Sequence, residues 1–443
     1  MLKLAFLLIG PDAFRARWYA LAGAGAFLLA IAAALMAGLS PTLTIATYLA
    51  LGLAFLGSGL LMAVVAVASS GPRRWLALAR PMMAILAGLL ILGTAFETGW
   101  LLSTAFAIAF ILDGAFRILM TLLTRFTGWV TSIACGIAEL ILAVMMLAGW
   151  PFSGAWNVAF CIGLFIGLSG WLLIRLGLLL RGLEDEAAIL LLPVFSGRGW
   201  YDHAPVLIGE APPRGPDDPP IVVRIWMPAG PERTRAGRPV IDRYLGAQDD
   251  EGVFSGGHAS LELAPDLYIS HWPASDFDLN GRGLMTVFSS RADNDMAGSF
   301  QRSYEEEAAD WRPADLRIEV HRFNPRRLKA FWAGYKQDAT YNITNRNCSV
   351  VVAAGLDAAL EGVLAGRHPW LRLLGLMIDP DLWVAAMIRT RASSMTWTPG
   401  LVLDYVRILV RIVERRDVSW GRRFRGFLGR VDGEITDRGA PAA

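Results

Sequence analysis

The chain has 443 residues, of which 54% are hydrophobic and 18% are charged, and its formal net charge at neutral pH is +2. A mean hydropathy of +0.44 excludes an ordinary soluble protein. The near-neutral charge gives no indication of a nucleic-acid partner, and none is expected. The three cysteines are Cys135, Cys161 and Cys348. They form no plausible disulfide framework, so the sequence does not require an oxidising compartment.

Long uncharged runs fill the first half of the chain. Each approaches or exceeds the ~20 residues that a helix needs to cross the hydrocarbon core of a bilayer. Buried helices of a soluble bundle would need polar faces, which these runs lack. The sequence therefore predicts an all-α bundle of six transmembrane helices within residues 1–185, at residues 18–39, 44–69, 78–96, 100–121, 129–149 and 155–180.

Positive charges mark one end of these predicted helices. Lys and Arg residues precede the first span, occupy the second and fourth loops and follow the sixth span: Lys3, Arg15, Arg17, Arg73, Arg74, Arg80, Arg125, Arg175 and Arg181. The alternate loops carry neither Lys nor Arg. By the positive-inside rule, both termini are expected in the cytoplasm.

An internal repeat runs through the predicted spans. Tryptophans open the odd-numbered spans and glycines recur in the even-numbered ones, at Trp18, Trp75, Trp129, Gly59, Gly114 and Gly170. This indicates three copies of a helical hairpin, with small residues where helices approach closely. The pattern over residues 10–182 resembles the HdeD family of bacterial inner-membrane proteins. That resemblance implies six spans and a role in acid and stress tolerance, and we expect any homo-oligomer to form through this domain.

Acidic residues also occur in this hydrophobic half. Asp113 and Glu139 lie at membrane depth and Glu97 at an outer edge. One interpretation is a helix-packing hydrogen bond made by a protonated carboxyl group. The other is a polar pathway for transport or proton sensing. No span shows the paired Gly/Pro interruptions of many transporters.

A linker over residues 186–220 contains the proline-rich stretch "GEAPPRGPDDPP". After it, residues 221–365 predict a cytosolic α+β domain. Strands are expected at 221–229 and 315–323, and a hairpin at 258–272. Residues 295–311 have helical spacing, and a further helix is predicted to be capped by Asn324 with Pro325 in its first turn.

Cys348 lies where the polar stretch "TNRN" meets the apolar helical stretch "SVVVAAGL". The unpaired N–H groups and positive potential of a helix N-terminus favour a thiolate, which is the nucleophilic form of cysteine. The same N–H groups can stabilise an oxyanion. The alternative is a small residue of the core.

A catalytic thiol needs a histidine partner. His258 is the best candidate, because it begins a predicted strand directly after "SGG". His321 is expected to be structural. His203 and His368 lie in predicted loops and carry no signal.

A histidine on a strand followed by a cysteine opening a helix resembles the circularly permuted papain-like fold of the NlpC-like superfamily, which includes the lecithin:retinol acyltransferase-like enzymes. The resemblance implies that Cys348 is the nucleophile and His258 the general base. It also implies a third polar residue on the next strand, for which His271 is the candidate. If residue 258 pairs with 273, His271 shares a face with His258. If 258 pairs with 272, His271 is structural and Glu262 or a backbone carbonyl orients the base.

The resulting prediction is a membrane-anchored cysteine hydrolase, a peptidase or amidase that works through an acyl-enzyme. The alternatives are a thiol-dependent acyltransferase or lipid hydrolase, and a non-catalytic stress-response protein with a ligand-binding domain. No cofactor is expected. No metal is expected either, because CxxC, HxxxH and HExxH spacings are missing from the sequence.

Residues 366–443 are predicted to form a basic, amphipathic C-terminal extension. Its arginine-rich part, 403–430, suggests either binding to the membrane surface or a helix packed on the domain. The apolar stretch 370–388 is interrupted at Asp379-Pro380. It is expected to be amphipathic or interfacial rather than a seventh span.

Overall fold

The computed structural model describes residues 1–67, 74–94, 99–125, 129–150, 154–182, 218–228, 241–244, 247–248, 254–275, 289–377 and 379–414. These residues fall into two compact units. The first contains Met1–Pro41 and Ser103–Val413, and the second contains Thr42–Leu102. The predicted linker lies almost wholly outside the described residues.

The first half of the chain is helical, as the hydropathy predicts. Within the described part of the chain, four helices are long and apolar enough to cross a membrane: Trp18–Met36, Trp100–Thr124, Trp129–Ala148 and Trp156–Arg181. Helices also occupy the second and third expected spans, where shorter apolar stretches, Pro41–Gly57 and Ala84–Gly93, are described. The chain is therefore a membrane protein by the length and composition of its helices. The full helices are α3 (Trp18–Met36), α4 (Pro41–Val67), α5 (Arg74–Thr94), α6 (Gly99–Thr124), α7 (Trp129–Ala148) and α8 (Gly154–Arg181).

The three repeated glycines lie at helix-helix contacts. A Cβ atom placed on Gly59 of α4 would be 2.8 Å from the backbone of α5. One placed on Gly114 of α6 would be 2.8 Å from the carbonyl oxygen of Gly136 in α7, and one on Gly170 of α8 would be 2.6 Å from that of Gly25 in α3. Each repeated glycine thus packs against the next odd-numbered span, and the last against the first. Only a residue without a side chain permits such backbone approach.

The two acidic residues at membrane depth both pair with Arg117, and Asp113 pairs in addition with Arg391 of α15 (Pro380–Ser394). Arg117 Nη2 is 2.7 Å from Asp113 Oδ2 on the same helix, α6, and 3.1 Å from Glu139 Oε1 on α7. The sequence reading did not consider Arg117 as their partner. The arrangement favours the helix-packing interpretation, with an ion pair in place of a protonated carboxyl group. Glu97 lies outside the described residues.

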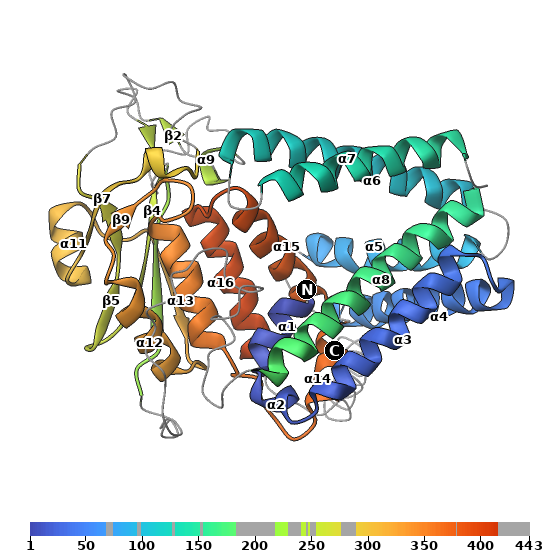
Figure 1. Cartoon of the computed structure of the whole chain (residues 1–443). Helices are drawn as coiled ribbons and strands as arrows, with labels where there is room; N and C mark the ends of the chain where they lie inside the picture. The colour runs from blue at the N-terminus through green and yellow to red at the C-terminus, as the bar shows by residue number, and fades with distance from the viewer. Residues whose placement is uncertain are drawn as a thin grey trace, which may run out of the picture. The chain divides into compact units, whose positions relative to one another are not determined.

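The second half contains small antiparallel sheets and helices (Figure 1). The largest sheet has the strand order β5 (Leu267–Ile269), β4 (His258–Leu263), β1 (Ile221–Trp226) and β8 (Leu316–Val320). A second sheet has the order β6 (His271–Pro273), β7 (Met296–Phe300) and β9 (Thr340–Tyr341). The remaining short elements are α9 (Ile241–Tyr244), the pair β2 (Ala247–Gln248) and β3 (Phe254–Ser255), and the 3-10 turn Ala292–Asn294.

The predicted strands and the predicted cap at Asn324 are confirmed. Helix α12 (Pro325–Tyr335) begins after Asn324, whose Oδ1 accepts a hydrogen bond from the Arg327 N–H at 3.1 Å. The expected helix over 295–311 is wrong in its first half. Residues 296–300 form β7, because they pair with β6 on one side and with β9 on the other. Helix α11 (Tyr304–Asp310) starts only after Ser303, which caps it.

Helix α13 (Cys348–Leu360) is the centre of the soluble domain, and every one of its residues is buried. It lies between the four-stranded sheet and α16 (Pro399–Val413), as Figure 1 shows. The inner face of α16 belongs to the same core. Residues 399–413 are therefore part of the domain and not of an extension, since their apolar face is covered by α13. The remainder of the arginine-rich tail, from residue 415, lies outside the described residues.

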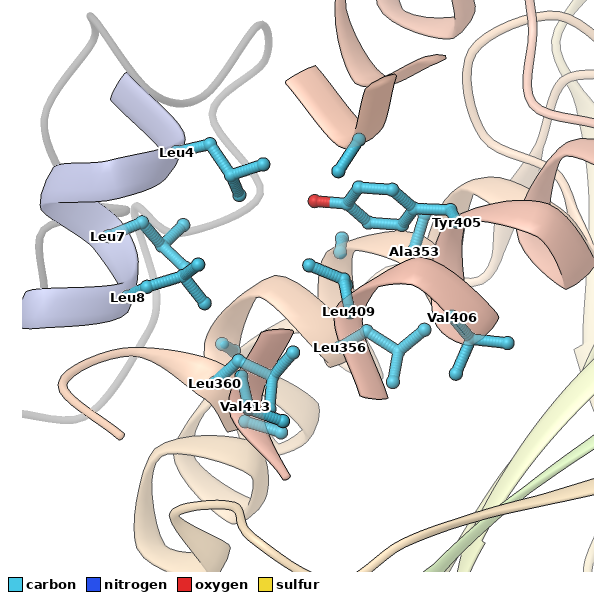
Figure 2. Close-up of a cluster of buried hydrophobic side chains, with 14 of the residues drawn as sticks. Leu4, Leu7, Leu8, Ala353, Leu356, Leu360, Tyr405, Val406, Leu409 and Val413 are labelled. Carbon is cyan, nitrogen blue, oxygen red and sulfur yellow. The ribbon is translucent and has the colours of Figure 1, made fainter. Parts of the chain in front are cut away.

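The N-terminal helix α1 (Leu2–Ile9) also belongs to this core. Residues 4–9 are at most 2% exposed. Leu4, Leu7 and Leu8 face side chains of α13 and α16, as Figure 2 shows. The Gly362 N–H donates a hydrogen bond to the Leu7 carbonyl at 2.9 Å, and the Leu364 N–H donates one to the Leu8 carbonyl at 2.7 Å. A segment that the sequence reading placed in the membrane domain thus completes the soluble one.

The expected interruption at Asp379-Pro380 separates two helices, α14 (Pro369–Met377) and α15 (Pro380–Ser394). Asp379 caps α15, with its Oδ1 accepting a hydrogen bond from the Asp381 N–H at 2.9 Å. Pro380 occupies the first helical turn, where its missing N–H costs nothing.

Candidate functional site

The nucleophile candidate Cys348 is the first residue of α13, as predicted. Asn347 builds this helix start. Its Oδ1 accepts a hydrogen bond from the Val350 N–H at 2.8 Å. Its Nδ2 donates to the carbonyls of Ile343 at 2.7 Å and Trp397 at 3.2 Å. The Asn347 side chain therefore fixes the approaching loop, the helix and the turn before α16 around the sulfur.

His258 begins β4, opposite Trp226 of β1. Gly257, just before it, has a φ of +69°, and a Cβ atom there would lie 2.5 Å from the Trp226 carbonyl oxygen. Only glycine fits this position, because it tolerates both the left-handed conformation and the close approach. The glycine in "GGH" thus brings the imidazole into the interior, where His258 is 2% exposed.

The two predicted residues, 90 positions apart in the sequence, meet in the structure. The Cys348 thiol and the His258 imidazole lie close enough for each to shift the pKa of the other. Burial opposes ionisation of the thiol, but attraction to His258 and the polar groups of His258, Ser349 and Ala259 beside the sulfur leave the pKa of Cys348 below its usual value. Burial likewise opposes protonation of His258, yet its interactions with Cys348 and with Glu307 raise its pKa to about 9. The raised pKa of the imidazole and the lowered pKa of the thiol both favour a thiolate-imidazolium pair at neutral pH.

The carboxylate of Glu307, in α11, lies next to Nε2 of the His258 imidazole. Its Oε1 lies 3.1 Å from His258 Nε2. Ser270 Oγ is 2.9 Å from the same nitrogen and donates a hydrogen bond to Glu307 Oε1 at 2.6 Å. Tyr268 and Trp272 also donate hydrogen bonds to this carboxylate. Burial raises the pKa of Glu307, but the hydrogen bonds and the His258 charge outweigh it and lower the pKa to about 2.

The sequence reading missed Glu307, which lies in a run of three glutamates. Glu305 and Glu306 are exposed, whereas Glu307 is 2% exposed. The sequence signal that distinguishes Glu307 from its two neighbours is its position in the helix. Ser303 caps the helix, and helical periodicity turns one glutamate of the next turn toward the sheet.

His271, the predicted third member, lies elsewhere. The ladder between β4 and β5 pairs Leu263 with Leu267 and Leu261 with Ile269, which is the register in which 258 and 272 would be partners if the ladder went on. This is the second of the two predicted registers. Residues 271–273 instead pair with β7. His271 Nδ1 is 3.0 Å from the Tyr335 hydroxyl, and its Nε2 donates to the Ala339 carbonyl at 3.3 Å.

His271 is a structural residue by these contacts. Burial lowers its pKa to about 4, so it is neutral at pH 7. Glu262, proposed for this second register, pairs with Arg224 on the neighbouring strand, and Glu307 is the carboxylate beside the imidazole. Of the other histidines, His321 and His368 are exposed, and His203 lies outside the described residues.

Aromatic rings enclose His258. Its imidazole stacks on Trp272 with ring centroids 4.3 Å apart, and it contacts Trp226 at 5.3 Å and Trp311 at 6.2 Å. Trp311 is 41% exposed, so the wall of aromatic rings formed by Trp226, Trp272 and Trp311 extends to the surface. The rings fix the plane of the imidazole and keep water from its face.

Tyr341 lies near Cys348. Burial, followed by the negative charge on the Cys348 sulfur, raises the pKa of Tyr341 well above its usual value, so its hydroxyl is neutral at pH 7.

The arrangement can attack a carbonyl carbon and protonate a leaving group. No protein-family model, curated protein or solved structure matches the chain. The chemistry of the site is therefore inferred from its geometry.

Proposed function

We propose that the soluble domain is a cysteine hydrolase of the peptidase or amidase type, anchored in a bacterial inner membrane. The observation that carries the proposal is the buried pair of Cys348 and His258, backed by the Glu307 carboxylate. Thiol at a helix N-terminus, imidazole and carboxylate supply the nucleophile, the proton carrier and its positioning group.

In the proposed reaction, the Cys348 thiolate attacks the carbonyl carbon of an amide or ester. The oxyanion forms beside the N–H groups that open α13. The imidazolium of His258 protonates the leaving amine or alcohol, and an acyl-enzyme thioester remains. Neutral His258 then takes a proton from water as the water attacks the thioester, which releases the acid and restores the pair. Glu307 is a positioning residue that holds the imidazole in place.

The order of His258 and Cys348 along the chain supports our proposal of a permuted papain-like fold. His258 begins a strand of an antiparallel sheet, and Cys348 follows it on a helix packed against that sheet.

The position of α1 supports six spans. Helix α1 precedes the first membrane helix, and α13 follows the last, yet they share one core. They must lie on the same side of the membrane, so the number of crossings is even. Four described spans with α4 and α5 give six, and the basic loops favour the cytoplasm for both termini. An HdeD-like role in stress response is the proposal for this half.

A thiol-dependent acyltransferase or lipid hydrolase is the second candidate. The aromatic wall of Trp226, Trp272 and the partly exposed Trp311 favours it, because such a wall suits an apolar acyl chain drawn from the membrane. An acyl thioester on Cys348 that is released to an added amine faster than to water would establish it over the peptidase. The third candidate function is that of a binding protein without catalytic activity.

The first test is labelling of the full chain, in detergent, with an alkyne-tagged chloroacetamide. We expect selective labelling of Cys348, loss of that label in Cys348→Ala, and strong reduction in His258→Ala. The exposed His321→Ala is the matched control and should label like the wild type. After incubation with peptide or phospholipid mixtures, mass spectrometry should find an acyl adduct on Cys348. Equal labelling of Cys348 in His258→Ala and the wild type would refute the catalytic pair.

The pH dependence provides a second test. Because His258 has a raised pKa, its proton is present below about 9 and is lost as the pH rises through that value. Hydrolysis, which needs the imidazolium, should therefore fall above pH 9. Alkylation of Cys348 by iodoacetamide should persist down to about pH 6, where an ordinary cysteine with a pKa of about 8.5 reacts slowly. In His258→Ala, the alkylation rate near pH 6 should drop to that of an ordinary thiol.

A further inference from the structure

Helix α14 is apolar on both of its faces. Its inner face, with Leu373 and Leu376, is buried in the domain core, whereas Leu371 and Leu374 on the outside are 68% and 63% exposed. A helix on the surface of a soluble domain normally carries polar residues there. The outer face of α14 therefore needs an apolar environment that the soluble domain does not provide.

The first turns of α15 extend this face. The Trp383 indole N–H donates a hydrogen bond to the Met377 carbonyl at 2.6 Å, which joins the start of α15 to the end of α14. Trp383 is 41% exposed, and Met387, one helical turn later, is 59% exposed. A tryptophan with a satisfied N–H and an exposed ring is typical of the boundary between lipid and water.

A ring contact holds α14 close to the start of the first membrane helix, α3. Phe14, in α2 (Asp12–Arg15), contacts Trp370 of α14 with ring centroids 5.2 Å apart. Helix α3 begins only four residues after Phe14, at Trp18. Four residues span at most roughly 14 Å even when extended. Because α3 is apolar from its first residues, α14 is held close to the plane where that helix enters the bilayer.

Positively charged residues lie just before the starts of α3 and α14. Arg17 directly precedes α3, Arg367 precedes α14, and both are exposed. Anionic phospholipid head groups attract such residues at a membrane surface.

We infer that the outer face of α14 and the start of α15, formed by Leu371, Leu374, Trp383 and Met387, lies in the interfacial layer of the bilayer that this chain spans. This second membrane attachment belongs to the soluble domain and is separate from the transmembrane helices. It holds the domain against the lipid surface whatever reaction the domain performs.

The test uses the full chain in nanodiscs of phosphatidylethanolamine and phosphatidylglycerol, with the photo-crosslinking residue p-benzoylphenylalanine at one position at a time. The positions are 371 and 374, whose native side chains are mostly exposed. Position 305 on α11, also exposed, is the negative control. Position 112 is the positive control, because Leu112 lies on α6 and is 66% exposed.

After illumination, mass spectrometry should find phospholipid adducts at positions 371, 374 and 112, in yields several-fold above position 305. The inference is overturned if position 112 captures lipid while 371 and 374 capture only peptide, whether from α4 or α5 of the same chain or from a second copy. Yields at 371 and 374 equal to that at 305 would overturn it as well.

Discussion

Replacing Glu307 with alanine is expected to reduce the rate of hydrolysis, as kcat/KM, by about 10²–10⁴-fold, the usual contribution of positioned acid-base catalysis. The carboxylate lies 3.1 Å from His258 Nε2, and its negative charge helps to raise the pKa of that imidazole. Without it, the ring loses both its orientation and part of its charge stabilisation. The measurement is the steady-state rate on the substrate found by the labelling experiment.

A pH profile separates positioning from a purely structural role. In Glu307→Ala, the pH above which activity falls should move downward from about 9, because a negative charge beside His258 is gone. Glu307→Gln keeps the size and one acceptor oxygen, so it should fold normally but show the same downward shift. Glu306→Ala, on the exposed face of the same helix, should leave both rate and profile unchanged. An unchanged profile in both Glu307 variants would contradict the positioning role.

Replacing Leu7 with aspartate is expected to unfold the soluble domain. Leu7 is 1% exposed and faces side chains of α13 and α16 in Figure 2. Truncating a buried leucine to alanine costs about 2–5 kcal/mol. An unpaired carboxylate at the same place adds the cost of burying a charge. Thermal unfolding of the detergent-solubilised chain should show a lower midpoint, and labelling of Cys348 should become unselective.

Lys3→Asp is the matched control for this variant, because it puts the same side chain into the same helix at a half-buried position. Lys3 lies near the cations Arg389 and Arg175, so an acidic residue there meets attraction in place of repulsion. We expect its unfolding midpoint to stay near that of the wild type. If the midpoints of the two variants were the same, α1 would not be part of the core.

Because α1 packs against α13, the domain is not expected to fold when it is expressed without α1. A fragment that begins after the membrane helices would expose the side chains of α13 and α16 that α1 covers. The domain that contains α13 and α16 is therefore expected to need residues 1–9 to be supplied with it. The order of segments in the sequence hides this dependence, because α1 and α13 are more than 300 residues apart.

The sequence by itself determined the features that depend on neighbouring residues. Uninterrupted hydropathy located the membrane helices, Asn324 and Asn347 marked helix starts, and the apolar stretch after Cys348 placed that thiol at a helix N-terminus. Each of these features depends on the solvation or the hydrogen bonds of residues close together in the chain.

Only the tertiary structure decided which groups meet. It selected Glu307 from three adjacent glutamates, placed Arg117 between Asp113 and Glu139, and excluded His271 through the register of the hairpin. It also brought α1 into the core of the soluble domain. The physical reason is that a side chain's charge and packing depend on what covers it. Several residues of one type have the same local preference until the folded chain buries one of them beside a partner.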